Sequence, residues 1–317
     1  MTRVLYSLFL LVFVLPGSAL ADDKIRFSIT STTITTVLPL WVAQKNGFFK
    51  QEGLEAEIIR TNANVGMAAL LSGNIDYVTL FSSVVRAAIQ GVPVRVVSAT
   101  VDKPNQTIIS RAGFKTIKDL KGKRIAIGSY GDQTDLVTRM VFKHFGIDAD
   151  KDLTVIPAGD QRSRLAMLQS SLVEGAVVDP FGLEKLGLNV AARAYELFTF
   201  PSSGLGVTLK KARENPDVIK RTIKAMIKAA RYMRSHRDGA IQVWTASSKS
   251  DRESAAAGID SFAGRLSDNG NMSESGLKML VEEIRKMVRV EREISLDDVA
   301  DYTMLRQAQK ELGLENR

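Results

Sequence analysis

Apolar positions along the chain follow first the period of a strand and then that of a helix. Residues 25–31 alternate between apolar and polar side chains, and an apolar stretch with helical spacing follows at 39–45. That stretch stops at Asn46 and Gly47, and a second strand is predicted at 54–59. Strand, helix, glycine stop and strand in this order predict a βαβ unit.

The same order occurs a second time along the chain. The predicted elements of this second unit are a strand at 124–129, a helix at 132–145 and a strand from 153 onward. Residues 68–80 align without a gap with residues 166–178, and this alignment places the acid Asp76 against Glu174. A register that holds over about 50 residues predicts two α/β lobes of similar plan.

Ligands of open α/β sheets bind outside the carboxyl ends of the strands. In this chain the predicted ends are residues 30–33, 80–83, 128–132 and 178–181. Two of them run directly into helices, so Ser82-Ser83 and Gly131-Asp132 are predicted to present free backbone N–H groups to an anion or a carbonyl oxygen. The same residue types are common helix N-caps, and capping is the alternative role.

The composition excludes several classes of protein. The 317 residues carry 43 Lys and Arg against 35 Asp and Glu, a net charge of +8, and 45% are hydrophobic, which is typical of a globular protein. The chain has no cysteine, so disulfides, thiol catalysis and Cys-ligated metal sites are excluded, and only two histidines remain, His144 and His236. We expect no cofactor and no metal. No Lys/Arg block with interleaved aromatic residues indicates a nucleic-acid partner.

The N-terminus has the layout of a secretory signal peptide. Arg3 precedes an apolar run at 4–15, and Ala19-Leu20-Ala21 forms an A-x-A cleavage pattern. The run is too short to span a bilayer, which takes about 20 residues, and we expect no stable membrane insertion. We expect residues 1–21 to be cleaved near Ala21 and the rest to be soluble in the bacterial periplasm. No cysteine stands at the cleavage point, so no lipid anchor is expected.

Five segments carry a resemblance to a known family. They are PLWVAQKNGFFKQEGLEAEI from Pro39, ALLSGNIDYV from Ala69, GVPVRVVSA from Gly91, DLKGKRIAIGSYGDQTDL from Asp119 and GAVVDP from Gly175. In combination they resemble the periplasmic substrate-binding proteins of ABC importers, and among these the nitrate, sulfonate, taurine and thiamine-pyrimidine binders. The resemblance covers residues 25–233.

The resemblance implies an α/β protein with the type II periplasmic-binding fold. In this fold two α/β lobes are joined by a hinge of two crossing segments, here expected near 109–115 and 198–207. The implied boundaries are a signal peptide at 1–21, the first lobe at 22–112, the second lobe at 113–200, and a return to the first lobe with additional C-terminal helices at 201–317.

Helical stripes in the C-terminal part are expected to be core. They are Ile219, Ile223, Met226, Ile227 and Ala230, and then Leu277, Leu280, Val281, Ile284 and Val288. We expect their helices to pack on the first lobe and on the back of the hinge.

The resemblance also implies a ligand pocket between the lobes. Its expected residues are Ser31, Thr32, Phe81, Ser82, Ser83, Ser129, Tyr130, Gly131, Asp132, Asp179, Ser202 and Ser203. The class of ligand stays open. Arg60 and Arg162 would suit a small anion, whereas Asp132 and Asp179 would suit the donor edge of a small heterocycle.

The implied function is that of a monomeric solute receptor, not an enzyme, which delivers a small molecule to the permease and ATPase of an ABC transporter. A periplasmic ligand sensor for a signalling receptor is an alternative that the sequence does not separate. Thiamine-pyrimidine synthases resemble the same family, but their active site resembles a cysteine-rich motif with histidines. A chain without cysteine cannot supply that motif.

Overall fold

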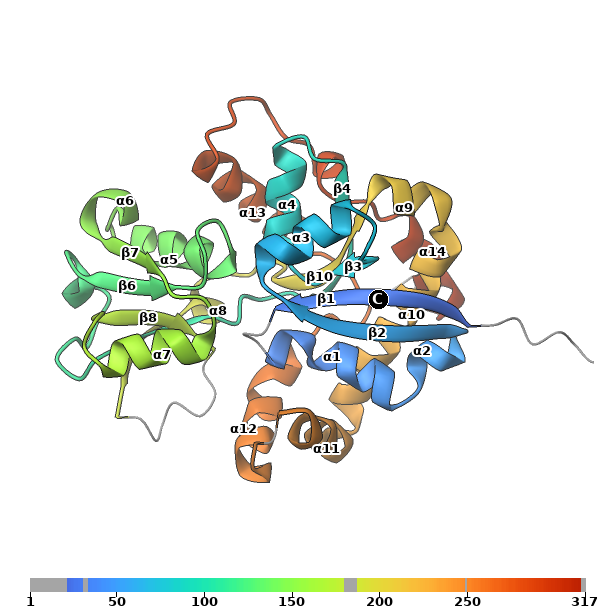
Figure 1. Cartoon of the computed structure of the whole chain (residues 1–317), viewed down its shortest axis with the longest axis horizontal. Helices are drawn as coiled ribbons and strands as arrows, with labels where there is room; N and C mark the ends of the chain where they lie inside the picture. Colours follow the sequence, from blue (N-terminus) through green and yellow to red (C-terminus); the bar gives the residue numbers. More distant parts are fainter. Residues whose placement is uncertain (1–21, 31–33, 180–186, 249, 315–317) are drawn as a thin grey trace, which may run out of the picture.

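The computed structural model describes residues 22–30, 34–179, 187–248 and 250–314, which form two α/β lobes (Figure 1). Each lobe contains one five-stranded sheet. The strand order of the first sheet is β2 (Leu54–Thr61), β1 (Asp23–Thr30), β3 (Tyr77–Val78), β10 (Ser203–Thr208) and β4 (Val94–Val101). That of the second is β7 (Thr154–Pro157), β6 (Arg124–Ile127), β8 (Gly175–Val178), β5 (Thr107–Ser110) and β9 (Asn189–Arg193). The predicted α/β class and the two lobes are confirmed.

The two sheets share one plan. Strand β1 pairs in parallel with β2 and β3, and β6 pairs in parallel with β7 and β8. The fourth strand of each sheet is antiparallel to both neighbours: β10 lies between β3 and β4, and β5 lies between β8 and β9. Each of these two strands follows directly after the chain has passed from one lobe to the other.

Helices connect the strands and cover the sheets. The helices between strands of the first lobe are α1 (Ile34–Lys45), α2 (Phe48–Gln51), α3 (Ala63–Leu71) and α4 (Phe81–Ile89). The second lobe has η1 (Lys118–Leu120), α5 (Gln133–His144), α6 (Ala149–Asp152), α7 (Gln161–Gln169) and α8 (Ala194–Leu197). The C-terminal part adds α9 (Leu209–Glu214), α10 (Pro216–Ser235), α11 (Arg237–Ser248), α12 (Arg252–Phe262), η3 (Ala263–Arg265), α13 (Glu274–Met287), η4 (Leu296–Asp298) and α14 (Thr303–Glu311). Among the helices of the described ranges, none is long and apolar enough to cross a membrane.

The first crossing between the lobes lies earlier than the sequence predicts. The expected segment was 109–115, but the chain leaves the first sheet at Val101 and enters the second sheet at Thr107, ahead of the predicted boundary at 113. The reason is β5, whose four residues are all buried and therefore lack the alternation that marks a strand. The crossing segments are thus residues 102–106 and 198–202.

The repeat reappears in the structure as a pair of equivalent contacts. The backbone N–H of Arg26 in β1 donates to Asp76 Oδ2 at 2.8 Å. In the second lobe the backbone N–H of Arg124 in β6 donates to Glu174 Oε2 at 3.0 Å. Each carboxylate comes just before a strand, β3 or β8, and ties it to the neighbouring strand. The alignment of Asp76 with Glu174 therefore reflects a shared structural role.

The return of β10 into the middle of the first sheet requires glycine. A Cβ built on Gly204 would lie 2.1 Å from the carbonyl oxygen of Ser98 in β4, and one built on Gly206 would lie 2.4 Å from Val84 Cγ2 in α4. A larger side chain at either position would push β10 away from its neighbours.

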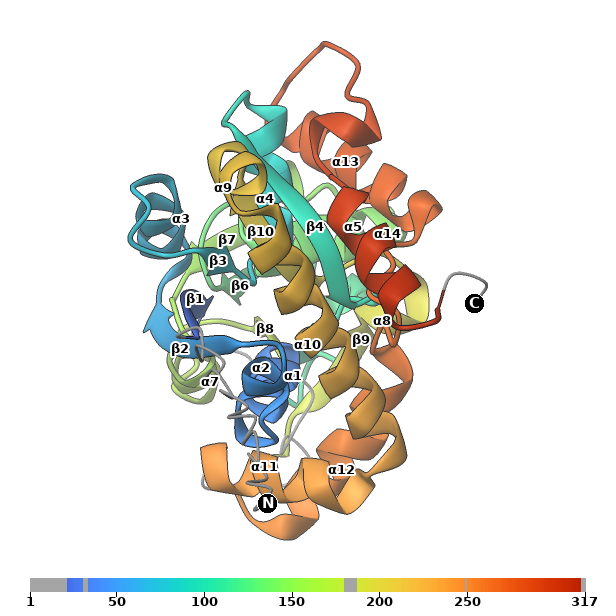
Figure 2. The ribbon, with the colours of Figure 1, turned by 90° about the vertical axis from the view of Figure 1, so that its right-hand side faces the viewer.

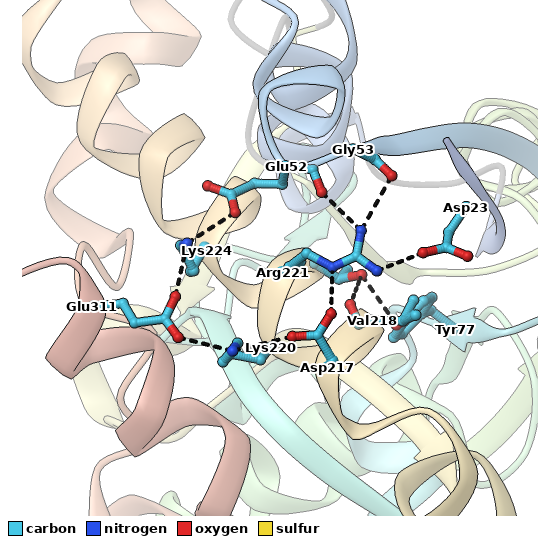
Figure 3. Close-up of polar contacts among 11 residues, drawn as sticks. Asp23, Glu52, Gly53, Tyr77, Asp217, Val218, Lys220, Arg221, Lys224 and Glu311 are labelled. Carbon is cyan, nitrogen blue, oxygen red and sulfur yellow. Dashed lines mark hydrogen bonds and ion pairs between the residues drawn. The ribbon is translucent and has the colours of Figure 1, made fainter. Parts of the chain in front are cut away.

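Helix α10 fastens the C-terminal part to the first sheet. Figure 2 shows α10 running beside β4, with α14 on its flank. The Arg221 guanidinium donates to the backbone carbonyl of Glu52 and to the carboxylate of Asp23 at the start of β1 (Figure 3). Lys224 forms ion pairs with Glu52 at 3.0 Å and with Glu311 of α14 at 2.9 Å.

The predicted C-terminal stripes are core. All members of the first stripe and four of the five in the second are buried, and Val288 is half-buried. Helix α10 packs on the first lobe as expected, whereas α13 packs on α4 and also reaches α5 of the second lobe. Lys143 and Glu283 form an ion pair at 2.9 Å across that second contact.

We expect Glu174→Gln to destabilise the protein in a pH-dependent way. The Arg124 side chain donates to Glu174 and holds the pKa of its carboxyl at about 2, well below its usual range. Such a group stabilises the fold above the unfolded pKa of about 4.3, and the contribution is lost as the pH falls toward 2. The variant should lose about 1–3 kcal/mol at pH 7 and progressively less below pH 4.5, as measured by urea denaturation.

Glu55→Gln is the matched control, because the Glu55 carboxyl is exposed and lies 3.9 Å from Lys24. It should change the free energy of unfolding by less than about 0.5 kcal/mol. Equal effects of the two substitutions at pH 7 would contradict the structural role of Glu174.

Candidate ligand-binding site

The lobes meet where α4 of the first lobe faces the loop between β6 and α5 of the second. A Cβ built on Gly131 in that loop would lie only 2.6 Å from Nη1 of Arg86 in α4, so the guanidinium lies against the loop backbone. We define the interlobe site as Ser82, Ser83 and Arg86 together with residues 129–133. Ser31 and Thr32, which were also predicted to line the pocket, lie outside the described residues.

The first-lobe side of the interlobe site is the start of α4. Ser82 and Ser83 are each 4% exposed. The first bond of the helical ladder runs from the Val84 N–H to the Leu80 carbonyl, so the N–H groups of both serines precede the ladder. Phe81 is different, because its ring is fully buried in the core and packs on β10.

The second-lobe loop is held mainly by its own hydrogen bonds. Asp132 caps α5 by accepting from the N–H groups of Thr134 and Asp135, and it also accepts from the Ser129 N–H. The Gly131 N–H donates to Asp135 Oδ2 at 2.7 Å. The predicted free N–H of Gly131 is therefore not available, and Asp132 has the alternative role of a cap.

Tyr130 occupies the outer side of this loop. Its side chain is 59% exposed, and its hydroxyl donates to the Val155 carbonyl at 2.9 Å. The phenol thereby ties the loop after β6 to the neighbouring strand β7, while much of the side chain stays open to solvent.

Arg86, at the contact between the lobes, and Gln133, at the start of α5, are polar residues that sequence reasoning missed. Nε of Arg86 and both side-chain polar atoms of Gln133 are buried and have no hydrogen-bond partner among the described residues. Buried polar groups are normally paired, so these atoms indicate a place where an external group would complete the hydrogen bonding. Arg86 also forms no ion pair with any described residue.

Asp179 lies at the end of β8 and faces the first crossing segment. It is buried, and its Oδ1 accepts from Asn105 Nδ2 at 2.9 Å. Burial raises the pKa of its carboxyl to about 7, although the charges of Arg164 and Arg265 and the bond from Asn105 oppose this. The backbone N–H of Asp179 donates to the Gln161 side chain at 2.8 Å. Asp179 thus joins the hinge to the second lobe.

Ser202 and Ser203 lie in the hinge. Ser202 Oγ donates to the carbonyl of Lys103 at 2.8 Å, which links the two crossing segments. Thr100 Oγ1 donates to Ser203 Oγ at 3.3 Å. Both predicted serines are nearly fully buried and hold strands together here.

The two arginines named from the sequence lie on the surface. Arg60 is exposed and stands over the Trp41 ring at 5.8 Å, and Arg162 is exposed as well. Arg164, two residues after Arg162 in α7, is buried, and its Nε donates to the Val177 carbonyl at 2.6 Å. The repeat could have drawn attention to Arg164. The offset of 98 residues that aligns 68–80 with 166–178 also aligns Arg164 with Gly66, so the second unit has an arginine where the first has a glycine.

Within the ranges that the structure describes, no group of three or more His, Asp and Glu side chains could hold a metal ion.

We expect Gly131→Ala to destabilise the protein more than Gly159→Ala. Both glycines have a left-handed backbone, with φ of 75° and 73°, so alanine costs about 1 kcal/mol at either position. Only at Gly131 would the new Cβ also collide with Arg86, whereas nothing lies within 4 Å at Gly159. Urea denaturation of the two variants measures the difference, and equal losses would show that Arg86 does not press on this loop.

We expect Asp179→Asn to remove a pH dependence of stability. Because the pKa of Asp179 is raised in the folded protein, the fold binds this proton more tightly than the unfolded chain does. Stability is therefore lost as the pH rises from about 4 to about 7. The variant should gain about 3 kcal/mol relative to wild type between pH 4.5 and 7.5 in urea denaturation. Asp238→Asn, at an exposed position, should leave the slope unchanged, and a wild-type slope in Asp179→Asn would refute the assignment.

Two proteins are similar to this chain in sequence, and they match it over different lengths. A 4-amino-5-hydroxymethyl-2-methylpyrimidine phosphate synthase from Uromyces fabae is 28% identical over 174 residues, which cover 53% of this chain and 48% of the synthase. The chain thus spans about half the length of that enzyme. A putative binding protein from Brucella abortus is 24% identical over 255 residues, which cover 76% of this chain and 77% of the relative.

A solved structure and a family model extend the comparison. The zinc-bound ligand-binding component of an ABC-type import system from Staphylococcus aureus superposes with a TM-score of 0.75 at 17% identity, covering 90% of this chain and 99% of that one. This similarity shows a shared fold. The model of the NMT1/THI5-like family matches residues 34–240, which is more than half of the chain. The protein therefore belongs to the NMT1/THI5-like family.

Proposed function

We propose that the protein is the solute-binding receptor of an ABC import system, which captures a small molecule between its lobes and delivers it to the permease and ATPase. The observation that carries this proposal is the interlobe site. There a guanidinium from one lobe faces a loop of the other, and neither Arg86 nor Gln133 is satisfied by the described part of the protein.

A two-lobed receptor works by shifting a hinge equilibrium. A solute that touches both lobes binds the closed form more tightly than the open form, and it therefore increases the closed population. The two short crossing segments, joined by Ser202 and Lys103, would let each lobe move as a unit. The closed form is the one that the permease would recognise.

The residues argue against a synthase activity. The chain has no cysteine for the motif that such enzymes resemble, and its two histidines lie at the C-terminal ends of α5 and α10. His144 packs edge-on against Phe145, and His236 stacks on Tyr232. The interlobe site lies at the opposite end of α5. We also propose that residues 1–21 direct export and that the protein works in the periplasm.

We expect one class of small solute to stabilise and compact the chain from Asp22 onward. The panel is nitrate, bicarbonate, alkyl sulfonates, taurine, aromatic carboxylates, thiamine pyrimidines and riboflavin, tested after unfolding and refolding to remove bound ligand. A solute at about 100 times its dissociation constant adds about 2.7 kcal/mol and raises the melting temperature by a few degrees. Small-angle scattering should show a smaller radius of gyration with the same solute.

Ser129→Ala and Asp179→Ala should weaken binding of that solute in calorimetry while the fold is kept. Unchanged affinity in both variants would place the ligand elsewhere. A solute that raises the melting temperature without compacting the protein would count against the receptor mechanism.

A further inference from the structure

We propose that Arg86 determines the specificity of the interlobe site by binding an anionic group of the solute, and that this contact couples recognition to closure of the lobes. The inference rests on the proposed receptor function and names the class of its solute. Its basis is the state of the Arg86 guanidinium, a charged group at the contact between the lobes that forms no ion pair with any described residue.

The nearby carboxylates are already engaged. Asp132 accepts hydrogen bonds from three backbone N–H groups of its own loop and helix. Asp135 accepts from the Gly131 N–H and from Arg139 Nε at 2.9 Å. No ion pair joins Arg86 to either of them, so within the described part of the chain the positive charge of Arg86 has no ion-pair partner. A partly buried charge is costly unless it is paired, and an anionic ligand would supply the partner.

Two other arginines near Asp179 differ from Arg86 in that the protein itself accepts hydrogen bonds from them. Arg164 donates from Nε to the Val177 carbonyl, and Arg265 donates to Ser261 while it stacks over the Tyr195 ring at 4.3 Å. Arg265 Nη1 is buried without a partner among the described residues, but its Nε and Nη2 are both bound to Ser261. Arg86 Nε is also buried without a partner there, and only Arg86 lies against the Gly131 loop of the other lobe, so it is the group that is left for a ligand at the interlobe site.

The residues around Arg86 include two serine hydroxyls, which can donate hydrogen bonds, and a glycine, which has no side chain. Side chains on a helix lean toward its N-terminus, so Arg86 reaches back over the turn that holds Ser82 and Ser83. Both serines are nearly fully buried, and their hydroxyls form no hydrogen bond with another described residue. Gly131 faces the guanidinium from the second lobe without a side chain. A planar guanidinium beside hydroxyl donors suits a carboxylate, a sulfonate or another oxyanion.

The same geometry explains the coupling to closure. Arg86 belongs to the first lobe, and the loop that it touches belongs to the second, so an anion bound there lies at the contact between them. Opening the lobes would separate Arg86 from Gly131. An anion held by Arg86 that also accepts from Gln133 would therefore bind the closed form better than the open form.

The test uses pairs of probes that match in size and differ in charge: propionate with propionamide, benzoate with benzamide, and ethanesulfonate with ethanesulfonamide. Each is measured by calorimetry and thermal shift on the wild type, Arg86→Gln, Arg86→Lys and Arg60→Gln. At least one anion should bind the wild type in preference to its neutral partner. Arg86→Gln should weaken that binding about 10- to 100-fold, as expected for charge-assisted hydrogen bonds.

Arg86→Lys keeps the charge without the planar fork and should lose less affinity than Arg86→Gln, which separates a charge effect from a folding defect. Arg60→Gln removes an exposed arginine and should leave affinity unchanged. Equal binding of a neutral partner, unchanged affinity in Arg86→Gln, or silence of all three anions at millimolar concentration overturns the assignment. A neutral solute that compacts the protein would overturn it and leave the receptor function standing.

Discussion

The passage of β10 through the middle of the first sheet is the constraint on which the rest of the structure depends. Because β10 pairs with both β3 and β4, the first sheet is complete only after the chain has visited the second lobe and returned. The absence of a side chain on Gly206 lets β10 lie close beneath α4. The same return brings the two crossing segments together, where Ser202 binds Lys103. The same return of the chain as β10 therefore gives the first sheet its strand order and forms the hinge.

The sequence predicts the repeated plan because both lobes follow local periods of two and 3.6 residues. It also identifies Asp76 and Glu174 as equivalent, since a carboxylate that binds the N–H of a neighbouring strand must stand at the same place in each unit. Strand β5 could not be predicted in this way, because all its residues are buried and a short buried run does not alternate between apolar and polar side chains. The predicted first crossing is late for that reason.

The arrangement of the interlobe site could not be predicted in the same way, because it depends on distances between lobes that no local pattern encodes. Asp132 has the residue type of a ligand contact, but its carboxylate is used by the first turn of α5. Arg86 has ordinary helical neighbours in the sequence, and only the approach of Gly131 from the other lobe gives it a role. The repeat does contain one signal for the second lobe, since a buried arginine, Arg164, stands where the first unit has Gly66.

The contact between Arg221 and Asp23 joins residues 198 positions apart, and β10 pairs with strands more than 100 positions earlier in the chain. The second sheet, by contrast, takes all its strands from residues 107–193. A chain that emerges from its N-terminus can therefore finish the second sheet while the first still lacks β10, the strand between β3 and β4. Until β10 arrives, β3 and β4 each have an unpaired edge, and such edges promote aggregation. The late arrival of β10 thus leaves the first lobe with exposed strand edges for longer than the second lobe during synthesis.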